Sequence, residues 1–134
     1  MHDSRKTALI LLAGDLVALA LFVLVGQREH ETIDAANPLL SVLPNVIAFA
    51  IPWMIAVWLL GALRVDNGRL RFFARTLNAW LVAALFGLLL RSFLFARAII
   101  PAIFIVATLG FGGLFLFAWR AVFLVARRFA GNLK

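Results

Sequence analysis

Four long apolar stretches, separated by short polar segments, dominate the chain. They cover about residues 7–26, 42–63, 76–95 and 99–125. Each is close to or longer than the ~20 residues that a helix needs to cross a ~30 Å hydrocarbon core. None alternates apolar and polar residues with a period of two, as the strands of a membrane barrel do. The pattern predicts an all-α protein with four transmembrane helices in an antiparallel bundle, which forms a single domain over residues 1–134.

The composition places these stretches in lipid. The chain has 134 residues, of which 65% are hydrophobic and only 14% are charged. Soluble domains have about 45–50% apolar and about 25% charged residues. A soluble protein this apolar could not cover its surface with polar groups. We therefore expect a multi-pass protein of the cell (cytoplasmic) membrane.

Basic residues are distributed unevenly between the two ends of the predicted helices. If the N-terminus is cytoplasmic, ten of the 13 basic residues lie on the inner side: Arg5, Lys6, Arg64, Arg69, Arg71, Arg75, Arg120, Arg127, Arg128 and Lys134. Only Arg28, Arg91 and Arg97 then lie outside. Because basic residues favour the cytoplasmic side, both termini are predicted to be cytoplasmic. Anionic membrane lipids account for the net charge of +7, so nucleic acid is not an expected partner.

Two charged residues are expected inside the membrane at similar depths. Asp15 follows Lys6 by nine residues, about 13 Å along a helix. Arg120 precedes Arg127 by seven residues, about 10 Å from the same side. Because intramembrane charges are costly and usually paired in the bundle interior, we predict that Asp15 and Arg120 form an inner polar pair. The pair would be either a proton or substrate relay, or a structural clamp between the first and fourth helices.

Small residues and tryptophans recur at helical spacing in the last two stretches. Trp80, Ala84 and Gly87 follow one another by four and three residues, which places them on one face of a helix. Gly112 and Trp119 are seven residues apart on the fourth helix. Small side chains allow membrane helices to approach closely. The spacing therefore predicts a helix-packing face formed by these five residues.

An outer polar cluster is predicted at the opposite side of the membrane from the inner pair. Its members are Arg28, His30 and Arg91. Arginine suits the phosphate or carboxylate group of a lipid or an anionic solute. Two other interpretations are open: the arginines extend to headgroups and set helix depth, or Arg91 lines an outward-open cavity between the third and fourth helices.

Several chemistries are excluded by residues that the spans lack. Lysine occurs only at Lys6 and Lys134, and histidine only at His2 and His30. A Schiff-base lysine or a histidine-ligated haem within the bilayer is therefore not expected. The absence of cysteine excludes disulfides and thiolate metal sites, and no glycine-rich phosphate-binding motif is present. We expect no catalytic residue, no metal site and no cofactor, and hence no enzyme.

The order of several short motifs resembles a known family. The motifs are Gly14-Asp15, Gly26-Gln27-Arg28-Glu29-His30, Pro52-Trp53, the segment from Arg75 through Trp80 and Gly87 to Arg91, and Trp119-Arg120. Together they resemble the prokaryotic membrane-protein family known as domain of unknown function 3054. The resemblance covers nearly the whole chain and implies four helices in one domain. It implies no activity, substrate or cofactor.

Two functional hypotheses follow from these observations. In the first, the protein binds or transports a small ligand or a lipid, with Asp15 and Arg120 at the inner polar level and Arg28 and Arg91 at the outer one. In the second, it is a structural or accessory subunit of a larger membrane complex, and the charges serve assembly. Expected partners are membrane lipids and, because four helices form a thin bundle, a second copy or a larger complex.

Overall fold

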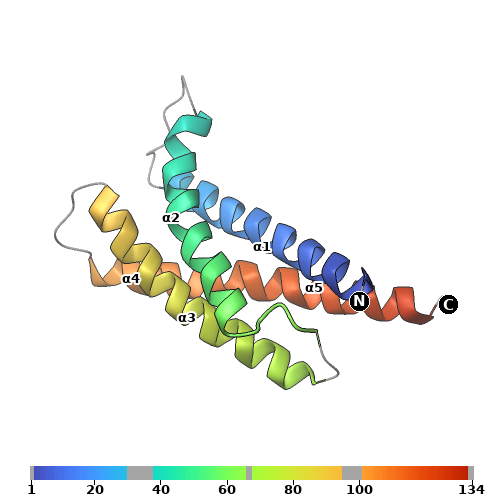
Figure 1. Cartoon of the computed structure of the whole chain (residues 1–134). Coiled ribbons are helices and arrows are strands. Elements are labelled where there is room, and N and C mark those ends of the chain that lie inside the picture. The colour runs from blue at the N-terminus through green and yellow to red at the C-terminus, as the bar shows by residue number, and fades with distance from the viewer. Residues whose placement is uncertain (1, 30–37, 66–67, 95–100, 133–134) are drawn as a thin grey trace.

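The computed structural model describes residues 2–29, 38–65, 68–94 and 101–132, and these residues form an all-α protein (Figure 1). Three α-helices come first: α1 (His2–Glu29), α2 (Pro38–Leu59) and α3 (Arg69–Leu94). The last helical rod consists of α4 (Ala102–Ala107), the π-helix η1 (Thr108–Gly112) and α5 (Gly113–Asn132).

The helices associate as two antiparallel pairs. α3 packs mainly against α2, and α5 runs beside α1 in the opposite direction (Figure 1). Aromatic rings join the two pairs at the centre, where Trp80 of α3 contacts Phe22 of α1 and Trp53 of α2 edge-on, with ring centroids 6.3 Å and 6.2 Å apart. The start of α1, the start of α3 and the end of α5 all lie at one end of the bundle (Figure 1).

Four helices are long and apolar enough to cross a membrane, which confirms the predicted fold class. They cover Ser4–Gly26, Val42–Leu59, Arg69–Leu94 and Ala102–Asn132. Most large apolar side chains outside the core face outward, as expected for a bundle in contact with lipid rather than water. The protein is therefore an integral membrane protein by the length and composition of its helices.

The second helix ends earlier than the predicted residue 63. Gly61 adopts a left-handed conformation with φ of 67°, and the amide of Ala62 donates to the carbonyl of Val57 at 2.9 Å. A glycine in this conformation, with a hydrogen bond spanning five residues, is a common helix stop. The apolar stretch continues past Leu59, but its backbone turns away and presents Ala62 to the bundle interior.

The third helix begins seven residues before the predicted residue 76. The amide of Phe72 donates to the carbonyl of Gly68 at 3.0 Å, which starts the helix at Arg69. The arginines Arg69, Arg71 and Arg75 place this segment in the polar break between two apolar stretches of the sequence. Arginine is nevertheless a good helix former, so charge at a membrane boundary does not interrupt the helix.

Candidate functional site

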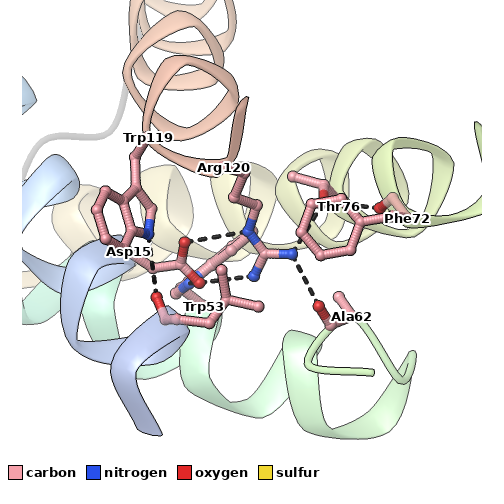
Figure 2. A network of polar contacts seen from close by, with 8 residues as sticks. Asp15, Trp53, Ala62, Phe72, Thr76, Trp119 and Arg120 are labelled. Carbon is pink, nitrogen blue, oxygen red and sulfur yellow. Dashed lines mark hydrogen bonds and ion pairs between the residues drawn. The ribbon is translucent and has the colours of Figure 1, made fainter. Parts of the chain in front are cut away.

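A buried ion pair lies at the centre of the bundle, between Asp15 of α1 and Arg120 of α5 (Figure 2). Both side chains have 0% exposure. The guanidinium binds the carboxylate through two hydrogen bonds: Nε donates to Oδ1 at 3.0 Å, and Nη2 donates to Oδ2 at 2.6 Å. Paired hydrogen bonds of this kind fix the orientation of both groups as well as neutralising their charges. The structure thus brings together the two residues assigned to the inner polar level.

The second terminal nitrogen of Arg120 is fully used as well. Nη1 donates to the carbonyl of Ala62 at 2.7 Å and to Oγ1 of Thr76 at 2.9 Å. The Thr76 hydroxyl in turn donates to the carbonyl of Phe72, one turn earlier in α3, at 2.9 Å. The hydroxyl can therefore offer its lone pairs to the guanidinium. Ala62 is available because the Gly61 turn ends α2 just before it.

Aromatic rings enclose the pair. The indole Nε1 of Trp53 on α2 donates to Oδ2 of Asp15 at 3.2 Å. The guanidinium carbon of Arg120 lies 5.2 Å from the ring centroid of Trp53 and 5.3 Å from that of Phe72. At this distance an aromatic face attracts a cation. The rings thus lie beside the pair, and the hydrogen bonds of both charged groups go to partners within the protein.

The network joins all four spans at one point. Asp15 comes from α1, Trp53 from α2, Thr76 from α3 and Arg120 from α5, with the Ala62 carbonyl from the turn after α2 (Figure 2). Arg120 uses four of its five N–H groups in these bonds. Four bonded N–H groups, with no exposure of either charge, are what a structural clamp needs. A relay would need a route by which protons or ligand reach the carboxylate.

Trp119, next to Arg120, packs on a glycine of α1. A Cβ atom added at Gly14 would overlap the indole of Trp119. The indole Nε1 donates to the carbonyl of Leu11 at 3.2 Å, three residues before that glycine. The missing Cβ lets the ring lie on the helix backbone and reach a carbonyl one turn earlier. Gly14 and Trp119 thus hold α1 and α5 close beside the ion pair.

Trp80 repeats this arrangement on the other side of the core. A Cβ added at Gly112 in η1 would overlap the Trp80 indole, whose Nε1 donates to the carbonyl of Leu109 at 3.0 Å. Leu109 again lies three residues before the glycine. The π-helical turn changes the backbone hydrogen bonding of this segment, and the tryptophan supplies a donor there from α3.

The residues of the predicted packing face therefore contact several different helices rather than one. Trp80 contacts η1, and Trp119 contacts α1. Gly87 faces α2, where an added Cβ would come 2.5 Å from Cδ1 of Phe49. Ala84 is completely buried in the core cluster. Spacing on one helix identified small residues that allow close packing, but it did not identify the partner helix of each.

The outer polar cluster is described only at Arg91. Its Nε donates to Oδ1 of Asn45 on α2 at 2.8 Å, and its guanidinium carbon lies 4.5 Å from the ring centroid of Phe104 on α4. The buried Asn45 was not singled out in the sequence, where an isolated asparagine after a proline indicates a turn. His30 and the side chain of Arg28 lie outside the described residues.

A second concentration of charge lies at the end of the bundle where α1 and α3 begin and α5 ends. We call this region the basic end, and it comprises residues 4–8, 60–65, 68–75 and 121–132. Two adjoining grooves open there, with volumes of about 570 Å³ and 680 Å³. Val65 and Arg127 line both. The grooves were not predicted, although the arginines that line them had been assigned to one side of the membrane.

Each groove combines arginines with apolar side chains. We call the first the α3–α5 groove; its main lining residues are Arg69, Arg127, Arg128, Val65, Phe73 and Leu124. We call the second the α1–α5 groove; its main lining residues are Arg5, Arg64, Arg127, Ala8, Leu63 and Val65. Asp15 is the single acidic side chain that the structure describes, and it is paired with Arg120. Within the described part of the chain, no carboxylate neutralises the groove arginines.

A metal centre has no support in the described residues. They contain no group of three or more histidine, cysteine or acidic side chains that could hold an ion. The functional groups at the site are thus arginine donors, aromatic rings and backbone carbonyls. These groups can bind an anion or fix helices together.

Comparison with known proteins identifies a family for this chain but no activity. Neither the curated proteins nor the solved structures yielded a match to this chain. The family model described as "Protein of unknown function (DUF3054)" matches residues 12–123. The matched region begins just before Asp15 and ends just after Arg120, so it includes the whole central network. The chain belongs to the DUF3054 family.

Proposed function

We propose that this protein is a non-enzymatic component of the cell membrane that binds anionic lipids at its basic end, with both termini in the cytoplasm. The observation that carries the proposal is the pair of adjoining grooves lined by Arg5, Arg64, Arg69, Arg127 and Arg128. Basic pockets on the cytoplasmic side of helical bundles suit the headgroups of anionic lipids.

The mixed lining of the grooves favours a lipid over a simple anion. Phe73 and Leu124 supply apolar surface beside Arg128 in the α3–α5 groove, and Leu63 does so beside Arg64 in the α1–α5 groove. A guanidinium binds a phosphate through two hydrogen bonds, while the neighbouring apolar wall accepts the start of an acyl chain. An amphipathic ligand satisfies both kinds of surface at once.

The central ion pair supports a binding protein more than a proton relay. Asp15 accepts hydrogen bonds from both Arg120 and Trp53 and has 0% exposure. The hydrogen-bonded groups connect all four membrane-spanning helices. On this proposal the pair is a clamp that shapes the lipid site, and transport is not required.

Lipid selectivity tests the proposal. The protein is reconstituted in nanodiscs with equal amounts of a phosphatidylcholine and a phosphatidylglycerol of identical acyl chains, and retained lipids are counted by native mass spectrometry. We expect the anionic lipid to be retained at least about tenfold more. Equal retention of the two lipids would contradict the proposal.

A charge-matched pair of variants assigns the effect to the grooves. Arg128→Gln removes one charge from the α3–α5 groove. Arg71→Gln removes one charge from the same end of the bundle, at an exposed residue that lines neither groove. We expect Arg128→Gln to reduce retention of phosphatidylglycerol and Arg71→Gln to leave it near the wild-type level. Equal losses would indicate a diffuse charge effect.

The cytoplasmic location of the termini is tested separately. Because the chain contains no cysteine, a single cysteine introduced as Ser4→Cys or Asn132→Cys can be labelled without background. In intact cells, a membrane-impermeant maleimide should leave both variants unlabelled until the membrane is opened. Labelling of intact cells would place these ends outside.

The alternative function is that of an accessory subunit in a larger membrane complex or in a homodimer. Purification in mild detergent with mass spectrometry distinguishes it from autonomous lipid binding. A protein partner recovered in stoichiometric amount, with no enrichment of anionic lipid, would favour the accessory subunit.

A further inference from the structure

We infer that the two grooves form one composite site for a lipid that carries two phosphates, with Arg127 between them. This inference rests on the proposed binding of anionic lipid and specifies the class of ligand. A diphosphatidylglycerol, in which two phosphatidyl groups are linked through glycerol, has this chemistry.

The position of Arg127 is the first argument. It lines both grooves, together with Val65. On one side are Arg69 and Arg128, and on the other are Arg5 and Arg64. Each groove therefore has two arginines of its own and shares the fifth. A phosphate in either groove would share Arg127 with a phosphate in the other.

The charge of the site is the second argument. Five guanidinium groups line the grooves, and Asp15, the acidic side chain that the structure describes, is committed to Arg120. One monophosphate lipid carries a single negative charge and occupies one groove, which leaves the other set of arginines without an anion. Two linked phosphates supply a negative charge to each groove at once.

Linkage also favours one lipid over two separate ones. When the first phosphate of a two-phosphate lipid is bound, the second is held near the adjoining groove at a high effective concentration. Two independent monophosphate lipids would each lose their own freedom of motion, and both would compete for Arg127. The two adjoining grooves should therefore bind a ligand with covalently joined phosphates more tightly than two separate lipids.

The apolar walls are the third argument, and they select a lipid rather than a soluble diphosphate. Phe73 lines the α3–α5 groove and stacks on Phe117 of α5, with ring centroids 5.6 Å apart and planes 16° apart. This contact holds an apolar wall next to the arginines. Ala8 and Leu63 give the α1–α5 groove an apolar wall of its own, so both phosphates have a surface for their acyl chains.

A competition between two anionic lipids tests the inference. Nanodiscs contain phosphatidylcholine with either diphosphatidylglycerol or phosphatidylglycerol, at equal total phosphate and with the same acyl chains, and the lipids bound to the protein are measured by native mass spectrometry. We expect diphosphatidylglycerol to bind at least about tenfold more tightly per molecule. In Arg127→Gln, we expect this preference to fall below about threefold, because the shared donor is lost.

The matched control is Arg71→Gln, which removes an exposed charge at the same end but lines neither groove. It should keep the wild-type preference. Because Arg127 is exposed, its replacement should leave the thermal unfolding temperature unchanged, and this measurement guards against loss of fold.

The outcomes separate the inference from the function on which it rests. If both anionic lipids bind more tightly than phosphatidylcholine but equally well, the two-phosphate inference is wrong and anionic lipid binding stands. If neither binds more tightly, the proposed function fails. If inorganic pyrophosphate displaces diphosphatidylglycerol at equal phosphate concentration, the site recognises soluble diphosphates and the assignment to a lipid is wrong.

Discussion

Arginine occurs in this protein in two contrasting environments. Arg120 is fully buried, and its hydrogen bonds go to Asp15, Ala62 and Thr76. Arg127, two helical turns later on the same helix, is exposed in the grooves of the basic end. The two side chains have the same charge and opposite surroundings.

The contrast shows how the environment determines what a membrane arginine can do. A buried guanidinium whose partners are all protein groups is committed to the fold, and removing one partner leaves an uncompensated charge in a medium of low polarity. A guanidinium at the membrane boundary that has no carboxylate partner among the described residues, such as that of Arg127, is available to lipid phosphate. The predictions below test this division by changing one environment at a time.

The largest effect is expected from Arg120→Met. The variant leaves the Asp15 carboxylate buried with only the Trp53 indole as a hydrogen-bond donor, and it should lower the free energy of unfolding by about 3–5 kcal/mol. Unfolding is followed by circular dichroism during titration with sodium dodecyl sulfate in mixed micelles. The double variant Asp15→Leu/Arg120→Met should lose less than Arg120→Met alone. A loss below about 1 kcal/mol in the single variant would contradict burial of the pair.

A smaller effect is expected from Gly14→Ala, which tests the close contact beside the pair. The added methyl overlaps the Trp119 indole, so this overpacking should cost about 1–3 kcal/mol in the same titration. Gly26→Ala in the same helix is the matched control, because nothing lies within 4 Å of an added Cβ there. It should be neutral or slightly stabilising, since alanine favours helix more than glycine does. If both variants lose the same free energy of unfolding, the contact between Gly14 and Trp119 does not explain the effect.

Thr76→Val should cost about 1–2 kcal/mol, because Nη1 of Arg120 loses one of its two acceptors while the Ala62 carbonyl remains. The unfolding titration again measures the change. Thr76→Ser retains the hydroxyl and is expected to recover most of the loss. If Thr76→Ser is as unstable as Thr76→Val, then the methyl group rather than the hydrogen bond stabilises the site.

Salt should have a large effect on lipid binding at the basic end and a small effect on the central ion pair. Raising ionic strength from about 0.05 M to about 1 M shortens the screening length to about 3 Å. Retention of anionic lipid at the basic end should fall several-fold, whereas the free energy of unfolding should change by less than about 0.5 kcal/mol because the central pair is not exposed. Lipid counting and the unfolding titration are performed on the same preparation. A fall in stability that parallels the loss of lipid would mean that the groove arginines also hold the fold.

The sequence predicts the four spans because hydropathy over some 20 residues is a strong signal. It also indicates Asp15 and Arg120, since charges within apolar stretches are rare and their depths can be counted from the helix ends. The helix boundaries are less predictable. The start of α3 at Arg69 and the stop of α2 at Gly61 depend on backbone hydrogen bonds, which average hydropathy does not register.

Three parts of the site could not be predicted from the sequence. The Ala62 carbonyl is a backbone group that every residue has, and only the turn at Gly61 directs it to Arg120. The grooves depend on how α1, α3 and α5 converge, which the spacing within one helix does not specify. The Trp119 contact with Gly14 is of the same kind: both residues are visible in the sequence, but their pairing across α1 and α5 requires the fold.

The ion pair has a consequence for how the protein is made. Asp15 and Arg120 are 105 residues apart in the chain, in the first and last spans. Because synthesis proceeds from the N-terminus, Asp15 has no counter-ion from Arg120 until the final helix has been translated. The pairing of the two core charges therefore coincides with completion of the bundle, and a chain that lacks the last span has no Arg120 to pair with Asp15.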